Sequence, residues 1–355
     1  AVPRSLSIAT TQRSGGKTTV AVGLCMALRQ RGLNAGYFKP VGTLAAHTGD
    51  TLLDEDAQFV AGLLELEDDL TDICPVVPDE DALRDVLSGN EVDAMSRVRE
   101  AYDRIRADKD IVVCEGLGEI WQGRFLRTSG TEVVKELDLG ALLVAKFAGA
   151  RLLDDIIYVK DALKQHLLGV LFNMVPESRL QLVEDEYTRF LAKNDIESYG
   201  ALVSSPTLSA VSVVEIVEAL GGTFVCGERY GDRLVETYMI GAMSPEHALR
   251  YFQLTPNKVV IVGGDRAEIV LAALNTPTVA VVLTGNYVPS TAVTERAEER
   301  GVPLVSVETD TVTAADGLRR LFGRLRVNDR TKIELIATLI DEAVDVDRLV
   351  RDLQA

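Results

Sequence analysis

The sequence predicts an α/β protein in which a doubly wound parallel sheet is followed by a smaller α/β unit. The first sixty residues alternate as strand, helix and strand, at Leu6–Ala9, Thr18–Arg31 and Ala35–Phe38. Strands and helices that alternate at this spacing form parallel sheets with helices packed on them. A second alternating series begins after Gly221-Gly222, which ends an expected amphipathic helix over Leu208–Leu220.

The other elements follow from short apolar runs and from helical periodicity. In the first unit we expect strands at Ile111–Cys114, Ala141–Val144 and Leu168–Phe172, and helices at Asp56–Leu64 and Val92–Ala107. In the second unit we expect strands at Val259–Val262, Val279–Leu283 and Leu304–Val307, and helices at Ala267–Leu274 and Ala292–Arg300. Residues 66–90 are acidic and give no clear element. We therefore divide the chain into domains at 1–222 and 223–330, with a C-terminal helix in 331–355.

Composition excludes several classes of function. The 355 residues are long enough for two domains, and 54 acidic against 37 basic side chains give a net charge of −17. This charge repels nucleic acid and anionic membranes, so we expect neither as a partner. The four cysteines are isolated, which argues against disulfides and zinc, and no apolar run is long enough to span a bilayer. We expect a cytoplasmic protein.

The strongest motif is TTQRSGGKTT at residues 10–19, between the first strand and the first helix. Small residues let successive backbone N–H groups point at phosphate oxygens, and the helix N-terminus favours an anion. Lys17 would reach the outer phosphates and Thr18 would offer its hydroxyl to Mg²⁺. Thr11 replaces the leading Gly of the usual motif. The pattern predicts a sheet of the P-loop NTPase type that binds ATP and Mg²⁺; an inert helix-capping turn is the alternative.

Three charged groups stand where strands end or helices begin. Lys39 follows the second strand, where it could pair with an anionic substrate or phosphate, or be a solvated lysine before a Pro turn. The acidic residues Asp54 to Asp56 open a helix; they could bind Mg²⁺ or simply favour the helix dipole. Glu115 ends an apolar strand and could bind a metal or position water, or be a surface turn residue.

Asn173 ends a later strand with an amide that could read an adenine edge, although Asn also ends strands in ordinary turns. In the second unit, Asp265-Arg266 could form an anion-binding turn, or Asp265 could cap the next helix. The residues expected to bind the nucleotide are Thr11, Ser14, Gly15, Gly16, Lys17, Thr18, Thr19 and Asn173.

Several motifs occur together in one known family. They are GGKT at 15–18, GYFKPVG at 36–42, EG at 115–116 and GVLFNMVP at 169–176. With them, the first 220 residues resemble the dethiobiotin synthetase-like P-loop family, and in particular the N-terminal region of long bacterial phosphotransacetylases. The remainder, with GAM at 241–243, VGGDR at 262–266, LTG at 283–285 and ERGVP at 299–303, resembles the DRTGG domain that follows in those proteins.

The resemblance implies roles for individual residues. Lys17 and Thr18 would hold phosphate and Mg²⁺, and Lys39 would face an anionic effector or substrate. Glu115 would complete the metal shell with Asp54 or Asp56. Lys17, Lys39 and Glu115 are thus the candidate catalytic residues, and Thr18, Asp54, Asp56 and Glu115 the candidate metal ligands.

Two functions follow from the resemblance. The first is a regulatory ATP-binding protein that assists a metabolic partner related to acetyl-CoA or acetyl phosphate, as a homo-oligomer or with a partner enzyme. It would have no acetyl transfer of its own, because the resemblance stops before the acetyl-transferring domain. The alternative is an ATP-dependent ligase that activates a carboxylate or carbamate, of the dethiobiotin or cobyrinic acid a,c-diamide synthase type. Any enzymatic activity would be that of such a ligase or of an ATPase. A scaffold that uses the fold only for oligomerisation is a third hypothesis.

Overall fold

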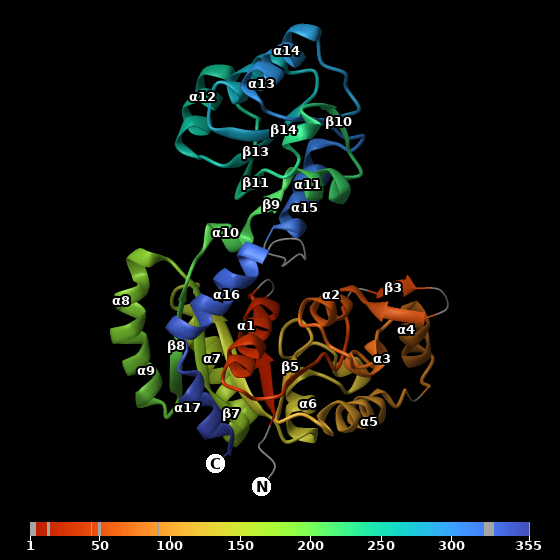
Figure 1. Cartoon of the computed structure of the whole chain (residues 1–355), viewed down its shortest axis with the longest axis vertical. Helices are drawn as coiled ribbons and strands as arrows, with labels where there is room; N and C mark the ends of the chain where they lie inside the picture. Colours follow the sequence, from red (N-terminus) through yellow and green to blue (C-terminus); the bar gives the residue numbers. More distant parts are fainter. Residues whose placement is uncertain are drawn as a thin grey trace. The chain divides into compact units, whose positions relative to one another are not determined.

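The computed structural model describes residues 5–12, 15–43, 45–48, 51–90, 92–322 and 330–354. It divides the chain into two compact units (Figure 1). The first comprises Ala1–Ser205 together with Leu325–Ala355, and the second Pro206–Arg324. In the part of the chain described, no helix is both long enough and apolar enough to cross a membrane.

The first unit contains a six-stranded sheet in which every pairing is parallel. Its order is β2-β5-β1-β6-β7-β8, with β1 (Leu6–Ala9), β2 (Ala35–Phe38), β5 (Ile111–Glu115), β6 (Gly140–Lys146), β7 (Leu167–Val175) and β8 (Glu197–Val203). The five strands expected in this unit are confirmed. The chain builds one side of β1 and then the other, and in open α/β sheets such a reversal leaves a ligand crevice beyond the carboxyl ends of the strands.

The sheet of the first unit is covered by helices, as a doubly wound fold requires. They are α1 (Lys17–Gln30), α2 (Glu55–Leu63), α3 (Leu70–Ile73), α4 (Glu80–Leu87), α5 (Ala94–Arg106), α6 (Gly130–Glu136), α7 (Arg151–Leu163), α8 (Leu180–Leu182), α9 (Thr188–Lys193), α16 (Arg330–Ala343) and α17 (Val346–Gln354). Helices α3 and α4 lie in the segment 66–90, to which the sequence assigns no element. A short hairpin of β3 (Ala45–Thr48) and β4 (Thr51–Asp54) is also absent from the sequence prediction.

The C-terminal segment packs on the first unit rather than on the second, which precedes it in the chain. Helix α16 lies beside α1 (Figure 1), where a Cβ added to Gly23 would lie 2.5 Å from Cγ1 of Ile340. The sequence predicts one helix here, whereas the structure has two. They are separated at Val344, which forms an isolated bridge with Gly200.

The second unit is a five-stranded sheet with a core on each face. Its order is β10-β15-β14-β13-β12, with β10 (Thr223–Cys226) antiparallel and β12 (Thr237–Ile240), β13 (Lys258–Gly263), β14 (Thr278–Thr284) and β15 (Leu304–Ser306) parallel. One core contains residues of α12 (Pro245–Leu254), α13 (Ala267–Leu274) and α14 (Thr291–Arg300), and the other contains residues of α11 (Val213–Leu220) and α15 (Thr311–Leu321). The expected strands and helices of this unit are confirmed.

The turn before α13 holds Asp265 and Arg266. The Arg266 guanidinium donates to the carbonyls of Gly241 and Met243, both at 2.9 Å. Helix α13 has no side-chain cap, so Asp265 does not cap it.

The single helix expected over Leu208–Leu220 is wrong. The structure has a short helix α10 (Pro206–Ser209), a strand β9 (Val211–Ser212) paired with β11 (Leu234–Val235), and then α11. The break follows from Ser212, which forms a capping box with Glu215 and therefore starts a new helix. Because α11 packs in a core of the second unit, the compact units divide after Ser205, whereas the sequence places the domain boundary at Gly222.

Among the described residues of the second unit, Lys258 is the most deeply buried charged side chain. The side chain is fully buried, and its Nζ contacts Oγ1 of Thr276 at 3.3 Å, the carbonyl of Pro277 at 3.2 Å and the face of the Phe252 ring. Among the described residues it forms no ion pair with a carboxylate. Burial lowers the pKa of Lys258 to about 8.

Replacing Lys258 with Met tests this burial. The folded-state pKa lies below that of an exposed lysine, so the buried ammonium destabilises the fold fully below pH 8, and this cost disappears as the pH rises from about 8 towards 10.5. We expect the free energy of unfolding of the wild type, relative to Lys258→Met, to rise by about 1–3 kcal/mol over this range. Urea unfolding of the full chain, followed by circular dichroism, measures it. The exposed Lys193→Met is the control; equal pH profiles for wild type and Lys258→Met would contradict the prediction.

Candidate functional site

The loop between β1 and α1 ends in two tightly enclosed glycines, Gly15 and Gly16. Gly16 precedes α1 with a φ of 84°, a left-handed conformation that favours glycine. A Cβ on Gly15 would lie 2.6 Å from Oγ1 of Thr10, and one on Gly16 would lie 2.3 Å from Nδ2 of Asn173. Both glycines are therefore required by their surroundings. Ser14, expected to bind nucleotide, lies outside the described residues.

Asn173, near the carboxyl end of β7, supports the loop between β1 and α1. Its Nδ2 donates to the carbonyl of Gly15 at 2.8 Å, and its Oδ1 accepts from the backbone of Met174 at 2.9 Å. The side chain is buried. In this structure the amide fixes the loop, and its proposed contact with adenine stays a prediction.

Lys17, the first residue of α1, contacts the loop that follows β5. Its Nζ donates to the carbonyl of Gly118 at 2.6 Å, in the loop that follows β5. Burial and the positive charge of Lys39 lower the pKa of Lys17, and this outweighs the opposite effect of Glu115. Thr19 lies half-buried in the same turn of helix.

Glu115, the last residue of β5, is buried and connects three elements. Its Oε1 accepts from the hydroxyl of Thr18 on α1, and its Oε2 accepts from the hydroxyl of Tyr37 on β2, each at 2.7 Å. Burial, and then the charge of Glu115, raise the pKa of Tyr37, so Tyr37 remains the donor. The surface-turn alternative for Glu115 is wrong, because the side chain is enclosed between α1 and β2.

Lys39 is only 2% exposed, so it is not the solvated lysine that the sequence left as an alternative. Its Nζ lies 2.7 Å from Oδ1 of Asp54 and 3.1 Å from Oδ2 of Asp56. Burial alone would lower the pKa of Lys39, but the charges of Glu115, Asp56 and Asp54 raise it, so the ammonium remains charged. Its charge is thus already balanced inside the protein.

Asp54 has a structural role at the start of α2. Its Oδ1 accepts from the backbone of Ala57 at 2.8 Å and its Oδ2 from the backbone of Thr43 at 2.7 Å, in addition to the ion pair with Lys39. The described part of the chain contains no group of three or more His, Cys, Asp or Glu side chains that could hold a metal.

The sequence missed three contacts of this site. They are the hydroxyl of Tyr37, the carbonyl of Gly118, and Asp155 on α7, whose Oδ2 accepts from the Thr11 hydroxyl at 3.2 Å. Only Tyr37 had a signal: it precedes Lys39 by two residues, and extended backbone turns such side chains to the same side. The other two contacts depend on how loops and α7 pack around the sheet.

An exposed aromatic pair connects the loop after β5 with α7. The rings of Trp121, in the loop after β5, and Tyr158, on α7, meet edge to face with centroids 6.4 Å apart. They are 42% and 58% exposed. The same loop is held to β1 by a hydrogen bond from Ile120 to the carbonyl of Thr10 at 2.8 Å.

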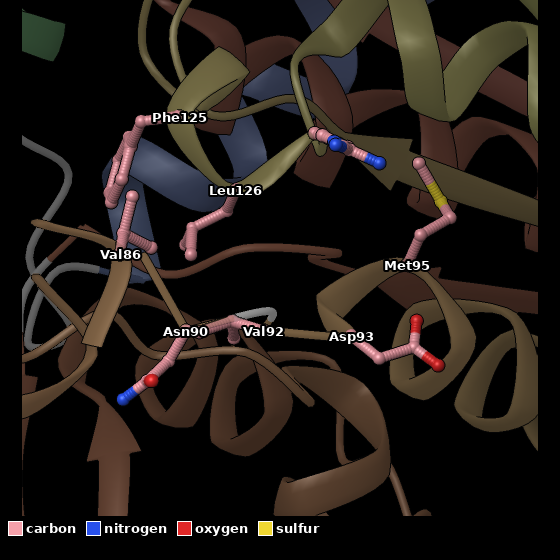
Figure 2. A pocket seen from close by; sticks show the side chains of 8 residues that line it. Val86, Asn90, Val92, Asp93, Met95, Phe125 and Leu126 are labelled. Atoms are coloured by element: carbon pink, nitrogen blue, oxygen red, sulfur yellow. The ribbon is translucent and has the colours of Figure 1, made fainter. Parts of the chain in front are cut away.

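The first unit also has a depression away from these residues. It measures about 590 Å³. Figure 2 shows that Phe125 and Leu126 of the short helix η1 (Arg124–Leu126) line it together with Val86. None of the residues expected to bind nucleotide or metal lines it. Its lining residues are Val86, Asn90, Val92, Asp93, Met95, Phe125, Leu126 and Arg127.

Comparison with known families finds two matches that meet near residue 220, whereas the compact units divide after Ser205. Residues 4–220 match the family described as AAA domain, and residues 215–321 match the DRTGG domain. Because the first match covers more than half of the chain, the chain belongs to this AAA domain family. The resemblance to the P-loop and DRTGG regions of phosphotransacetylases is confirmed.

Among curated proteins, the chain is similar over nearly its whole length to phosphate acetyltransferases. It is 26% identical to that of Pseudomonas aeruginosa, over 96% of this chain and 51% of the relative, and 25% identical to that of Synechocystis, over 99% and 52%. The chain thus spans about half the length of these relatives. It is also 29% identical to the ATP-dependent dethiobiotin synthetase of Caldicellulosiruptor saccharolyticus, over 32% of this chain and 48% of the synthetase.

Solved structures give weaker similarities. The cell-division protein MinD of Pyrococcus horikoshii, complexed with Mg-ADP, matches with a TM-score of 0.35 and 18% identity, over 58% of this chain and 83% of MinD. The CBS and DRTGG domains of Clostridium perfringens pyrophosphatase, complexed with the activator diadenosine tetraphosphate, match with a TM-score of 0.30 and 16% identity, over 49% and 87%.

A pair of glycine substitutions tests the geometry of the loop. Gly16 and Gly32 both have positive φ, but a Cβ would contact Asn173 at Gly16 and nothing within 4 Å at Gly32. Each change to Ala costs about 1–2 kcal/mol for the left-handed backbone, and we expect Gly16→Ala to cost about 1–3 kcal/mol more because of the clash. Thermal unfolding of the two variants measures the difference. Equal losses of stability would mean that Asn173 does not pack against this loop.

Proposed function

We propose that this member of the AAA domain family is a regulatory protein that binds ATP and Mg²⁺. In this proposal, nucleotide occupancy of the first unit controls association with a metabolic partner, or ligand occupancy of the DRTGG unit. The single observation that carries the nucleotide part is the arrangement at the carboxyl end of β1. There the Gly15-Gly16 turn, Lys17 and the Thr18–Glu115 pair lie together.

The donor set fits a nucleotide that carries its metal. The Thr18 hydroxyl and the Glu115 carboxylate are oxygen groups of the kind that Mg²⁺ prefers, and they lie 2.7 Å apart beside the loop. Mg²⁺ binds through few protein groups together with substrate phosphates, and when bound it would neutralise phosphate charge. Asp54 and Asp56 remain candidates for contacts through water, although both now pair with Lys39.

Local charge supports a strict need for the metal. Lys17 and Lys39 stand among Glu115, Asp54 and Asp56, in a chain whose net charge is −17. A nucleotide without its cation would add negative charge to this surplus. The Lys17 ammonium and the bound cation together would neutralise the charge of the phosphates.

The regulatory role is favoured over the ligase by the state of Lys39. A ligase that activates a carboxylate or carbamate needs a free cation opposite the phosphate loop as an anchor for its anion. Here Lys39 is 2% exposed and paired with two carboxylates. The phosphate acetyltransferase relatives suggest a partner in acetyl-CoA or acetyl phosphate metabolism. A screen of carboxylic acids and amines for stimulated release of ADP separates the two hypotheses, because only the ligase predicts stimulation.

Lys17→Ala tests nucleotide binding. Lys17 directly follows the Gly15-Gly16 turn, and the loss of a charge-assisted hydrogen bond should weaken ATP binding in Mg²⁺ about 10- to 100-fold. Calorimetric titration of the full chain measures the affinity. Lys109→Ala is the control, because Lys109 pairs with Asp68 and Asp108 before the amino end of β5. If the titration detects no binding of ATP to the wild type in Mg²⁺, the proposed function is wrong.

Trp121 reports whether the loop after β5 responds to the nucleotide. A phosphate that takes the Lys17 ammonium releases the Gly118 carbonyl, three residues before the only tryptophan of the chain. We expect saturating ATP and Mg²⁺ to change the Trp121 emission by about a tenth or more, since the ring is partly exposed against Tyr158. Lys17→Ala should abolish the change. Calorimetric binding without any change in emission would show that the loop does not move.

A further inference from the structure

Glu115 is held from two sides by groups that belong to different elements. Strand β5 lies between β2 and β1 in the sheet, and α1 follows β1. The Tyr37 hydroxyl therefore reaches Glu115 from the β2 side, and the Thr18 hydroxyl reaches it from the side of the phosphate loop. One carboxylate oxygen faces each side.

The partner on the β2 side is rigid. Tyr37 is fully buried in β2, where it pairs with Val113 of β5, and its hydroxyl donates to Oε2 at 2.7 Å. This bond keeps the carboxylate from turning, because rotation that brought Oε2 to the loop side would break a buried hydrogen bond to a charged group. Only Oε1 is therefore presented beside Thr18.

From this geometry we infer that Tyr37 is a positioning residue that limits Glu115 to one-oxygen contact with the cation of the nucleotide and so selects Mg²⁺ over Ca²⁺. The inference rests on the proposed function. Mg²⁺ is small, prefers octahedral geometry and binds few protein groups, whereas Ca²⁺ accepts more oxygens and readily takes both oxygens of one carboxylate. A carboxylate fixed with one oxygen turned away suits the first ion and not the second.

Neither the sequence motif nor the resemblance gives Tyr37 this role. Partners that orient a metal-binding group commonly change metal affinity tenfold or more when they are removed. The phenol differs from phenylalanine by one oxygen, so Tyr37→Phe removes the hydrogen bond and keeps the ring. Oε2 is then free to turn towards the loop and to join Oε1 on a larger cation.

The test is calorimetric titration of ATP into the full chain in Mg²⁺, in Ca²⁺ and in a chelator. We expect the wild type to bind more tightly in Mg²⁺ than in Ca²⁺, and Tyr37→Phe to lower that preference about tenfold, with the affinity in Mg²⁺ reduced and that in Ca²⁺ unchanged or raised. Tyr102→Phe is the matched control: Tyr102 is buried on α5 against Phe38, and its hydroxyl makes no contact with Glu115 in the structure described.

The outcomes separate the two claims. A loss of affinity that is equal in Mg²⁺ and Ca²⁺, or an unchanged ratio, overturns the role of Tyr37 while the proposed function stands. No binding by the wild type with either cation overturns the proposed function and this inference together. If Tyr37→Phe does not fold, Tyr37→Met removes the same hydroxyl with an unbranched side chain and is measured in the same way.

Discussion

The site depends on one buried carboxylate at the end of a central strand. Glu115 accepts a hydrogen bond from α1 through Thr18 and another from β2 through Tyr37, and so it connects the phosphate loop to the sheet. A buried carboxylate is costly unless its oxygens are hydrogen-bonded. The hydrogen bonds that satisfy Glu115 therefore connect the first turn of α1 and Tyr37 to the same carboxylate, and they leave Oε1 on the side of Thr18.

Lys39, the buried lysine beside Glu115, is subject to the same constraint, because a buried ammonium also needs partners that balance its charge. Lys39 is enclosed next to Glu115 and is neutralised by Asp54 and Asp56, and Asp54 in turn caps α2 and holds the backbone of Thr43. In the second unit, Lys258 pairs with no carboxylate among the described residues, and burial lowers its pKa to about 8. In the first unit Lys39 is paired with carboxylates, whereas Lys17 donates to a backbone carbonyl, that of Gly118.

Local patterns in the sequence predicted most strands and the loop at residues 10–19. They also predicted that Glu115 lies close to Lys17 and Thr18, because parallel strands bring their carboxyl ends to one edge of the sheet. They failed where distant packing decides. Strand β9 pairs with β11, more than twenty residues further along the chain, and the C-terminal helices pack on α1 although the whole second unit separates them from it in sequence. The pairing of Lys39 with Asp54 depends on an unforeseen hairpin, β3–β4, that ends in Asp54. For that reason the sequence could place Lys39 at the site but could not say what it binds.

The most direct test of the account is a crystal structure of the full chain with Mg²⁺ and a non-hydrolysable ATP analogue. The account predicts phosphates on the Gly15-Gly16 turn, a cation beside Thr18 and Glu115, and Lys17 moved from the Gly118 carbonyl to a phosphate oxygen. A nucleotide bound elsewhere, with Lys17 still on Gly118 and Glu115 without a cation, would contradict it.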